Sequence, residues 1–314
     1  MEADLVALVR RVTGAGPHHA REIHTFDHSS VVRVTTDDAR SLIVKRGPRE
    51  GDAFLCVREV RFYRHIAGQL DPGICPACYL AEEDEEKATL VLQDLREGHA
   101  PAGEFRRRSE SEMMIAALAD LHGSARRIAD LPTVFRGAFG ESPYNTVAGR
   151  FAAFEPILES FLGAWDNKLT VQARAVLEEL RGLGSLLDGE GDTTIVHGDA
   201  HFGNALYGEE RAVLIDWGNV ALGFGEIDVA HLIAMNLPRE QSRAWEGDLL
   251  TIYRDQLAAQ GFECTLEAIR RRYSIGSRYA VASAIGMWHF GLPHAVWWSL
   301  FTNAIDTVTE LGSI

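Results

Sequence analysis

Short apolar runs separated by polar turns fill most of the first third of the chain, a pattern typical of β-strands. Residues 4–13 instead have apolar positions at helical spacing, and so does a stretch at about residues 54–68. Strands are predicted at residues 22–25, 30–35, 41–45, 78–81 and 88–92. The N-terminal part therefore reads as an antiparallel sheet accompanied by few helices.

From about residue 109 onward the apolar positions recur with helical spacing. Helices are predicted at residues 111–122, 144–164, 169–187, 239–260, 265–285 and 294–311, with another beginning at 228–235. The composition changes at residues 93–98. We therefore expect an α+β protein with an N-terminal lobe at 1–96, a hinge near 93–98, and a larger, mainly helical lobe at 97–314.

One hairpin interrupts the helical part. The runs at residues 205–207 and 212–215 flank Gly208–Arg211, which is turn chemistry. Closing the hairpin brings Asn204 opposite Asp216, within one residue of register. Side chains opposite each other on one face have Cβ atoms about 5 Å apart. An amide oxygen and a carboxylate at that distance can share one hard cation.

The loop that enters the hairpin gathers further polar groups. Asp199 lies five residues before Asn204, and His197 and His201 flank it. Asp216 follows four apolar residues, so it should be partly buried and should need a cation, because buried acids are rare unless paired or metal-bound. We expect the two histidines to shape the loop by hydrogen bonding.

The lysines of the chain are sparse. There are three, Lys45, Lys87 and Lys168, in a chain that otherwise uses arginine. Lys45 ends an apolar strand, where a compact positive charge suits a phosphate oxygen. A lysine at a strand edge can also simply extend to solvent. Glu59, on the predicted helix at 54–68, is positioned to pair with Lys45.

Composition and charge narrow the range of functions. The chain of 314 residues is 46% hydrophobic and carries a net charge of −14, which argues against nucleic acid or an anionic membrane as partner. Cys75 and Cys78 have no second cysteine pair to complete a zinc site, so we interpret them as small apolar residues. We expect a protein of the cytoplasm, where thiols stay reduced.

Residues 279–305 contain no Asp, Glu, Lys or Arg, and this length could span a bilayer. The stretch also contains histidines, glycines and a proline. We therefore interpret it as two buried helices broken near Gly291-Leu292-Pro293.

These features suit phosphoryl transfer in a cleft between the two lobes. Such a reaction needs positive charge on the phosphates and a carboxylate near the acceptor hydroxyl. In this interpretation Asn204 and Asp216 bind Mg²⁺, Lys45 contacts the phosphates, and Asp199 orients the hydroxyl and accepts its proton late in the reaction.

The motif HGDAHFGN at 197–204, followed by IDW at 215–217, resembles the aminoglycoside phosphotransferase family and its relatives, the choline/ethanolamine and other small-molecule kinases. The segments SLIVK, REVRFYRHIA, LVLQDL, LADLH and GFGEIDVAHL extend the resemblance over nearly the whole chain. It implies a protein-kinase-like bilobal fold.

The resemblance also implies roles for single residues. Lys45 would contact the α- and β-phosphates with Glu59 as its partner, and Asp199 would be the catalytic aspartate. Gln93 and Leu95 would lie beside the adenine. Mg²⁺ would be held by Asn204 and Asp216, and Asp228 would brace the catalytic loop.

Two positions depart from the pattern of the family. No glycine-rich sequence covers the phosphates, since the turn at residues 25–30 has no glycine. The backbone amides of Ser29 and Ser30 are the expected substitutes. Gln93 stands where relatives often have an acid, which leaves ATP and GTP both open as donors.

The interpretation is a Mg²⁺-dependent O-phosphotransferase acting on an antibiotic or related natural product, as a monomer or homodimer. The alternatives are a metabolic kinase of choline, homoserine or a sugar, a metallohydrolase using His197, Asp199 and His201, and an inactive binding module. The acceptor is expected in the helical lobe, where the aromatic candidates are Trp165, Trp288, His289, Trp297 and Trp298.

Overall fold

The computed structural model describes residues 3–26, 29–48, 54–102, 107–189 and 192–312. Its N-terminal part is a five-stranded antiparallel sheet in the order β1-β2-β3-β5-β4. The strands are β1 (Pro17–Phe26), β2 (Ser29–Thr36), β3 (Ser41–Pro48), β4 (Cys78–Glu83) and β5 (Lys87–Gln93). Each predicted strand is present, and each is longer than the sequence pattern indicated.

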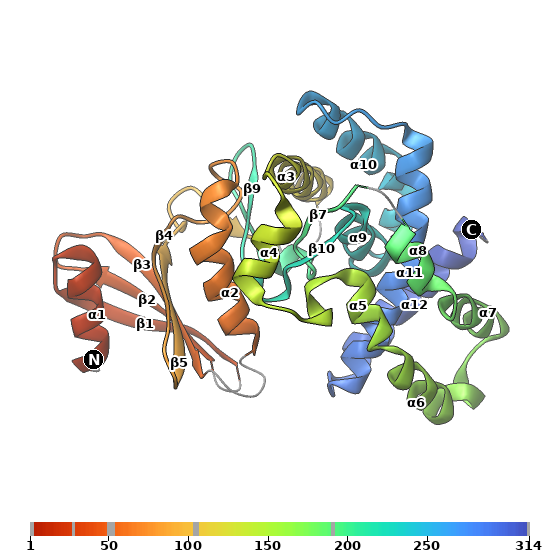
Figure 1. The fold of residues 1–314 in the computed structure, drawn as a ribbon, viewed down its shortest axis with the longest axis horizontal. Coiled ribbons are helices and arrows are strands. Elements are labelled where there is room, and N and C mark those ends of the chain that lie inside the picture. The colour runs from red at the N-terminus through yellow and green to blue at the C-terminus, as the bar shows by residue number, and fades with distance from the viewer. Residues whose placement is uncertain (1–2, 27–28, 49–53, 103–106, 190–191, 313–314) are drawn as a thin grey trace.

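One helix covers each face of this sheet. The helix α1 (Ala3–Thr13) buries an apolar face against Leu42, Val44 and Val91 of the sheet. The helix α2 (Phe54–His65) lies on the other side, between the sheet and the helical part of the molecule (Figure 1). Because side chains alternate along a strand, Lys45 points to the face that α2 covers.

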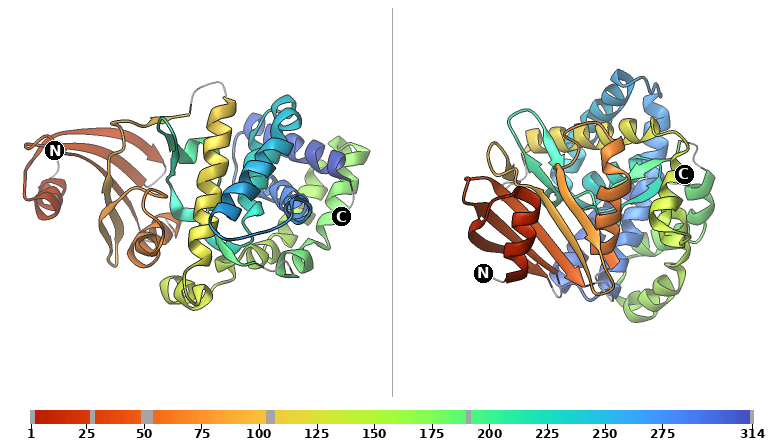
Figure 2. Two further views of the ribbon diagram at one scale, coloured as in Figure 1. Left: turned by 90° about the horizontal axis from the view of Figure 1, so that it is seen from above. Right: turned by 60° about the vertical axis from the view of Figure 1, so that its left-hand side comes forward.

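The rest of the chain is mainly helical (Figure 2). Its helices are α3 (Arg108–Arg126), α4 (Leu131–Phe139), α5 (Val147–Ala152), α6 (Glu155–Trp165), α7 (Val171–Leu180), α8 (Leu183–Gly189), α9 (Glu226–Ala230), the π-helix η7 (His231–Asn236), α10 (Arg239–Ala259), α11 (Leu266–His289) and α12 (His294–Leu311). Short 3₁₀ turns are η2 (Ala67–Gln69), η3 (Pro143–Asn145), η4 (Asp166–Lys168), η5 (Phe202–Asn204) and η6 (Trp217–Asn219).

Two small sheets lie within the helical part. One pairs β6 (Ala100–Pro101), β8 (Ala205–Tyr207) and β9 (Ala212–Leu214) in the order β6-β8-β9. The other pairs β7 (Thr194–Val196) with β10 (Ala221–Gly223). The sequence pattern did not predict a strand at residues 221–223, whose backbone is paired because they lie beside β7.

Three further differences concern helices. The sequence pattern did not predict α4, whose nine residues are near the limit of a periodicity argument. The helix expected at 144–164 is broken into η3, α5 and α6, with Pro156 in the first turn of α6, where proline lacks only a hydrogen bond that would be unmade anyway. The helix expected at 169–187 is interrupted at Arg181 and Gly182.

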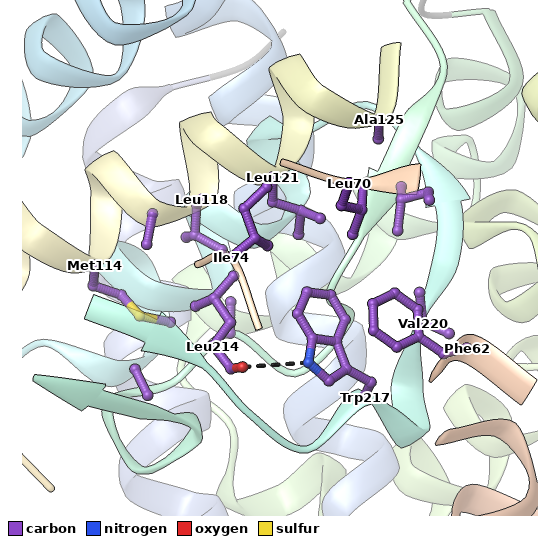
Figure 3. Close-up of a cluster of buried hydrophobic side chains, with 14 of the residues drawn as sticks. Phe62, Leu70, Ile74, Met114, Leu118, Leu121, Ala125, Leu214, Trp217 and Val220 are labelled. Carbon is purple, nitrogen blue, oxygen red and sulfur yellow. Dashed lines mark hydrogen bonds between the residues drawn. The ribbon is translucent and has the colours of Figure 1, made fainter. Parts of the chain in front are cut away.

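The largest apolar cluster runs across both parts of the molecule. It contains residues of α2 and β5 as well as α3, β9 and α10. Figure 3 shows its centre, where the indole of Trp217 lies between Phe62 of α2 and the α3 side chains Leu118 and Leu121. The indole nitrogen donates a hydrogen bond to the Leu214 carbonyl oxygen at 3.3 Å. The buried face of α2 is therefore shared between the sheet and the helical part.

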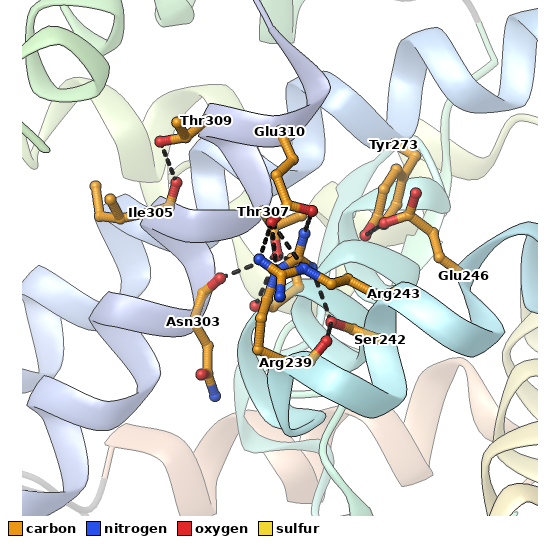
Figure 4. Close-up of polar contacts among 11 residues, drawn as sticks. Arg239, Ser242, Arg243, Glu246, Tyr273, Asn303, Ile305, Thr307, Thr309 and Glu310 are labelled. Carbon is orange, nitrogen blue, oxygen red and sulfur yellow. Dashed lines mark hydrogen bonds and ion pairs between the residues drawn. The ribbon is translucent and has the colours of Figure 1, made fainter. Parts of the chain in front are cut away.

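The C-terminal helices form a second apolar cluster with α6 and α7. Figure 4 shows polar contacts that join α12 to α10, where Arg239 and Arg243 of α10 both pair with Glu310 of α12. The uncharged stretch at 279–305 forms the C-terminal part of α11 and most of α12, and the break near Gly291 is where it was predicted. Among the helices of the described residues, none combines the length and apolar character that a bilayer span requires.

Candidate active site

The hairpin of β8 and β9 has the register that its turn predicts. Ala205 pairs with Leu214, and the Asn204 carbonyl oxygen accepts a hydrogen bond from the Ile215 amide at 2.9 Å. Asn204 therefore lies opposite Ile215, and Asp216 follows at the next position. This is within the one residue of register that the sequence allowed.

The backbone of Asp216 is turned away from the strand. Asp216 is in the left-handed region, with φ of 66° and ψ of 70°, which is uncommon for a residue other than glycine and marks a strained site held by its surroundings. Trp217 provides that hold, because its side chain is fully buried and its amide donates to Glu59 Oε1 at 3.3 Å. The carboxylate of Asp216 stays about half exposed, with a relative side-chain accessibility of 52%.

Lys45 lies between two carboxylates. Its Nζ is 2.5 Å from Glu59 Oε2 and 2.9 Å from Asp216 Oδ1. Burial alone would lower the pKa of Lys45, but the charges of Glu59 and Asp216 outweigh burial and raise it above its usual range. Lys45 is therefore positively charged at every physiological pH.

The pKa values of the two carboxylates are shifted in opposite directions. Glu59 is almost completely buried, and burial raises its pKa although the charge of Lys45 opposes the shift. For Asp216 burial also acts to raise the pKa, but the charge and hydrogen bond of Lys45, with the charges of His197 and His201, together lower it below its usual range. Asp216 is thus the ionised, solvent-facing oxygen donor of the group.

Asp199 and Asn204 contact each other within the loop that enters the hairpin. The Asn204 side-chain nitrogen donates to Asp199 Oδ2 at 3.0 Å and to the Asp199 carbonyl oxygen at 2.9 Å. Both contacts use the amide nitrogen, so the amide oxygen of Asn204 is the atom that can bind a cation. Asn204 is buried, whereas the Asp199 carboxylate keeps 27% of its accessibility.

Asp228 binds the backbone of the loop that contains Asp199. Its carboxylate accepts hydrogen bonds from the amides of His197 at 2.6 Å and Gly198 at 2.9 Å, and it contacts His122 Nε2 at 3.0 Å. Gly198 has φ of 78°, and a Cβ there would lie 2.0 Å from the Asn219 carbonyl oxygen. The loop therefore requires glycine at position 198. Asp228 fixes the backbone of the loop through the amides of His197 and Gly198.

The three histidines near this loop differ in what they contact. His197 Nε2 contacts the Ile215 carbonyl oxygen at 2.9 Å, and His201 Nδ1 accepts a hydrogen bond from the Gly203 amide at 3.0 Å. Both shape the loop, as expected. His231 belongs to none of the candidate site residues expected from the sequence, and its Nε2 lies 3.6 Å from Asp199 Oδ1. Its available signal was the spacing Asp228-x-x-His231.

The geometry does not favour the metallohydrolase alternative. His197 is fully buried, and its Nε2 contacts the Ile215 carbonyl oxygen. Across the residues that the structure describes, no three His, Cys, Asp or Glu side chains are grouped so that they could hold a metal ion. The site that does form combines the Lys45 ammonium group with the carboxylates of Glu59 and Asp216, and the Asn204 amide with the carboxylate of Asp199.

The segment expected beside the adenine follows β5. Gln93 is the exposed end of this strand, and its backbone amide donates to the Ala77 carbonyl oxygen at 2.8 Å. Leu95 is partly exposed. The side chain of Asp94, between them, is held toward strands β2 and β3, because Arg33 and Ser41 donate to its carboxylate at 2.7 and 2.6 Å.

The expected phosphate-covering turn is only partly described. Residues 27 and 28, at its tip, lie outside the described residues. Ser29 and Ser30 begin β2, where their backbones pair with Phe26 and Thr25 of β1. Ser30 also pairs with Arg46 of β3, one residue after Lys45, so the turn is adjacent to Lys45 in the sheet.

The aromatic candidates for an acceptor site form one cluster where α6, α11 and α12 meet. Trp165 stacks on His294, and His294 stacks on Trp298. Trp297 is 2% exposed and belongs to the core, whereas His289 is exposed at the end of α11.

Comparisons with known proteins agree with this geometry. A sequence model described as the phosphotransferase enzyme family matches residues 22–264. Comparison with curated protein sequences gives no significant match.

Solved structures of similar fold include three kinases. The apoenzyme of the macrolide 2'-phosphotransferase MphH from Brachybacterium faecium aligns with a TM-score of 0.63 at 16% identity, covering 95% of this chain and 98% of that one. A choline/ethanolamine kinase family protein from Mesorhizobium loti gives 0.59 at 16% identity, covering 98% and 93%. The APH(2'')-IIa of a ternary complex with streptomycin and ATP gives 0.57 at 14% identity, covering 99% and 98%.

The family match spans most of the chain, and the predicted α+β, protein-kinase-like fold is confirmed by these structures. The chain therefore belongs to the phosphotransferase enzyme family, and it is a small-molecule kinase built on the protein-kinase-like fold.

Proposed function

We propose that this chain transfers the γ-phosphate of ATP or GTP, with Mg²⁺, to a hydroxyl group of a small molecule, an antibiotic or related natural product. The observation that carries the proposal is the position of Lys45 Nζ, within 2.9 Å of Asp216 and 2.5 Å of Glu59. One ammonium group from the sheet and one exposed carboxylate from the hairpin are thereby adjacent, as a magnesium–phosphate complex requires.

The residues present fit a magnesium ion. Asp216 offers an ionised carboxylate and Asn204 an amide oxygen, which are the hard oxygen donors that Mg²⁺ prefers. The ion, when bound, would neutralise phosphate charge. Lys45 would then exchange its contact with Asp216 for the α- and β-phosphates, while Glu59 holds its ammonium group in place.

The nucleotide base would lie at the hinge near residues 93–98, between lobes at 1–96 and 97–314. We assign Gln93 and Leu95 to this contact, because the Asp94 side chain between them is held toward the sheet by Arg33 and Ser41. The backbone amides of Ser29 and Ser30 would cover the phosphates, next to Lys45 in the sheet.

Asp199 is the proposed catalytic residue. The acceptor hydroxyl oxygen bonds to the γ-phosphorus, the bond from that phosphorus to the β,γ-bridging oxygen breaks, and the nucleoside diphosphate leaves. The hydroxyl proton passes to Asp199, whose carboxylate is oriented by Asn204 at 3.0 Å. A base in this position contributes about 10²–10⁴-fold to the rate.

We propose the acceptor class from the uncharged stretch of α11 and α12 and from the structures of similar fold. Tyr279 of α11 lies close enough to Arg150 and Asp228 to feel their charges, and Arg150 donates to the Asn219 carbonyl oxygen beside Gly198. From Tyr279 to Ile305 no residue carries a formal charge. Two solved structures of similar fold are antibiotic phosphotransferases, the macrolide 2'-phosphotransferase MphH and APH(2'')-IIa in complex with streptomycin, and this further supports a natural product as acceptor.

A second candidate is a metabolic kinase of a cationic alcohol such as choline, with homoserine and sugars as further metabolic acceptors. Its specific support is the indole of Trp165, over which Lys168 Nζ lies 4.2 Å from the ring centroid. A cation–π site of this kind also binds quaternary ammonium groups. We further propose that the protein acts in the cytoplasm, as a monomer or homodimer.

The test is a panel of hydroxyl compounds incubated with Mg²⁺ and either ATP or GTP, scored by the mass gain of one phosphate. The panel contains macrolides, aminoglycosides, choline, homoserine and sugars. A gain with a natural product of low charge supports the proposal, and a gain with choline or a sugar alone replaces the acceptor but keeps the mechanism. Nucleotide that is never consumed, or stoichiometric zinc in the purified protein, would overturn it.

A further inference from the structure

His231 is a buried histidine that the proposed reaction leaves without a role. It is the first residue of the π-helix η7, directly after α9, and it is 5% exposed. Its Nε2 lies 3.6 Å from Asp199 Oδ1 and has no hydrogen-bond partner among the described residues. A buried polar atom without a partner is rare enough to need an explanation.

The position of His231 on its helix supplies one. His231 follows Asp228 by three residues, so the two side chains lie on one face of the same turn. Asp228 binds the backbone amides of His197 and Gly198, and His231 faces the side chain of the next residue, Asp199. One turn of helix therefore contacts three consecutive residues of the catalytic loop.

The Asp199 carboxylate consequently has neighbours on both of its oxygens. Asn204 donates to Oδ2 at 3.0 Å, and His231 lies on the side of Oδ1. His201 Nε2 is also 3.7 Å from Oδ2, but its side chain keeps 36% of its accessibility. His231 is the buried neighbour, so its position is the better defined of the two.

We propose that His231 is a positioning residue, which donates its Nε2 hydrogen to Asp199 Oδ1 and fixes the orientation of the carboxylate toward the acceptor hydroxyl. This inference rests on the proposed function of Asp199. The separation of 3.6 Å shortens to a hydrogen bond when substrates are bound, as catalytic contacts commonly do. With Asn204 on the other oxygen, the carboxylate is prevented from rotating.

The environment of His231 keeps its ring neutral. Burial lowers the pKa of His231 and outweighs the attraction of Asp199, while the neighbouring His201 acts in the same direction as burial. A neutral ring has one N–H, and a hydrogen bond from Nε2 selects the tautomer that carries it there. His231 therefore orients Asp199 without taking its proton.

The test compares two substitutions of similar size. His231→Gln keeps an N–H donor close to the position of Nε2, and His231→Leu removes it. With the acceptor found in the panel, or with water if none is found, we expect His231→Leu to lower kcat for nucleoside diphosphate release about 10–100-fold, a part of the contribution of a positioned base. The KM for nucleotide should stay unchanged, and His231→Gln should restore most of kcat.

The matched control is His65→Leu, at the exposed end of α2, which should leave kcat and KM unchanged. A His231→Leu enzyme with the kcat of the wild type would overturn the inference. So would equal losses of kcat and of thermal stability in both His231 variants, because these would indicate a purely structural role.

A second readout does not depend on turnover. Long-range ¹H–¹⁵N correlation spectra of the wild type, assigned by the signal missing in His231→Gln, should show the Nε2–H tautomer, and the ring signals should shift in Asp199→Asn. The Nδ1–H tautomer would overturn the inference. A wild type that never consumes nucleotide would overturn the proposed function instead, and the spectra would still decide whether His231 donates to Asp199.

Discussion

The ring of Phe62 lies parallel to the indole of Trp217, with ring centroids 4.1 Å apart and an interplanar angle of 8°. Phe62 follows Glu59 on α2, and Trp217 directly follows Asp216. Glu59 and Asp216 are therefore connected in two ways. Both contact Lys45, and the segments that carry them pack against each other through Phe62 and Trp217. We infer that α2 and the Asp216 turn hold their positions as one unit.

Replacing Trp217 with alanine tests this coupling. Because the indole is fully buried, Trp217→Ala should lower the free energy of unfolding by about 3–5 kcal/mol, measured by urea denaturation. The affinity for Mg-nucleotide, measured by calorimetry below the melting temperature, should fall as well, because Asp216 loses the anchor of its turn.

The control for this prediction is Trp217→Phe, which keeps a ring against Phe62 and should retain most of the nucleotide affinity. If Trp217→Ala bound nucleotide as tightly as the wild type, the packing behind the carboxylates would have no part in positioning Asp216.

The contact between Lys45 and Glu59 should show strong coupling in a double-mutant cycle. Glu59→Gln leaves the ammonium group with one carboxylate, and Lys45→Met leaves a buried acid without its cation. We expect Lys45→Met to destabilise the fold by up to about 3–5 kcal/mol, with the double variant much less affected than the sum of the two.

Lys87→Met is the matched control for that cycle, since Lys87 pairs with Asp4 in an exposed position. Its loss should change the free energy of unfolding by about 0–1 kcal/mol. Additive effects of the Lys45 and Glu59 substitutions would mean that the two groups do not stabilise each other.

Substitutions of Asp199 and Asp216 should differ in their effects on turnover and on Mg-nucleotide binding. Asp199→Ala should lower kcat by about 10²–10⁴-fold and leave the dissociation constant of Mg-nucleotide nearly unchanged, because Asp199 faces the acceptor. Asp216→Ala should weaken Mg-nucleotide binding as well as turnover. Isothermal titration calorimetry beside single-turnover kinetics measures both quantities, and an Asp199→Ala enzyme that kept most of its activity would contradict the assignment.

The parts of the site that local sequence could predict are those set by local geometry. The hairpin register follows from the turn at Gly208–Arg211, and it fixes Asn204 next to Ile215 and one residue from Asp216. Lys45 at the end of a strand and Glu59 on the helix that follows were expected to pair, and the two side chains are in contact. In each case segments that are close in the sequence decide the answer.

The parts that local sequence missed depend on contacts between distant segments. His231 lies 32 positions after Asp199 in the chain, and its proximity follows from the packing of α9 and η7 beneath the loop. The short β10 exists because residues 221–223 lie beside β7, which no pattern within those three residues indicates. The hydrogen bonds that Arg33 and Ser41 donate to Asp94 likewise join segments that are distant in the chain.

The hydrogen bonds that Asp228 accepts from the loop should make the free energy of unfolding depend on pH. Burial alone would raise the pKa of Asp228, but the hydrogen bond and charge of His122, the charge of His197 and the Gly198 amide lower it below the ordinary value of 3.8. The unfolded chain therefore binds the proton more readily than the folded one. The stabilisation that ionised Asp228 contributes is complete above the unfolded pKa and is lost as the pH falls through the lower, folded value.

We expect Asp228→Asn to lower the free energy of unfolding by about 3 kcal/mol at pH 7, because it removes one partner of a buried, hydrogen-bonded group. The deficit should shrink as the pH is lowered from 5 toward 3, where the wild type loses the same stabilisation by protonation. Urea denaturation of both proteins across this range measures the difference. Asp248→Asn, at an exposed position on α10, should show a small deficit that does not change in this way. A deficit for Asp228→Asn that stays constant with pH would show that the charge of Asp228 does not stabilise the loop.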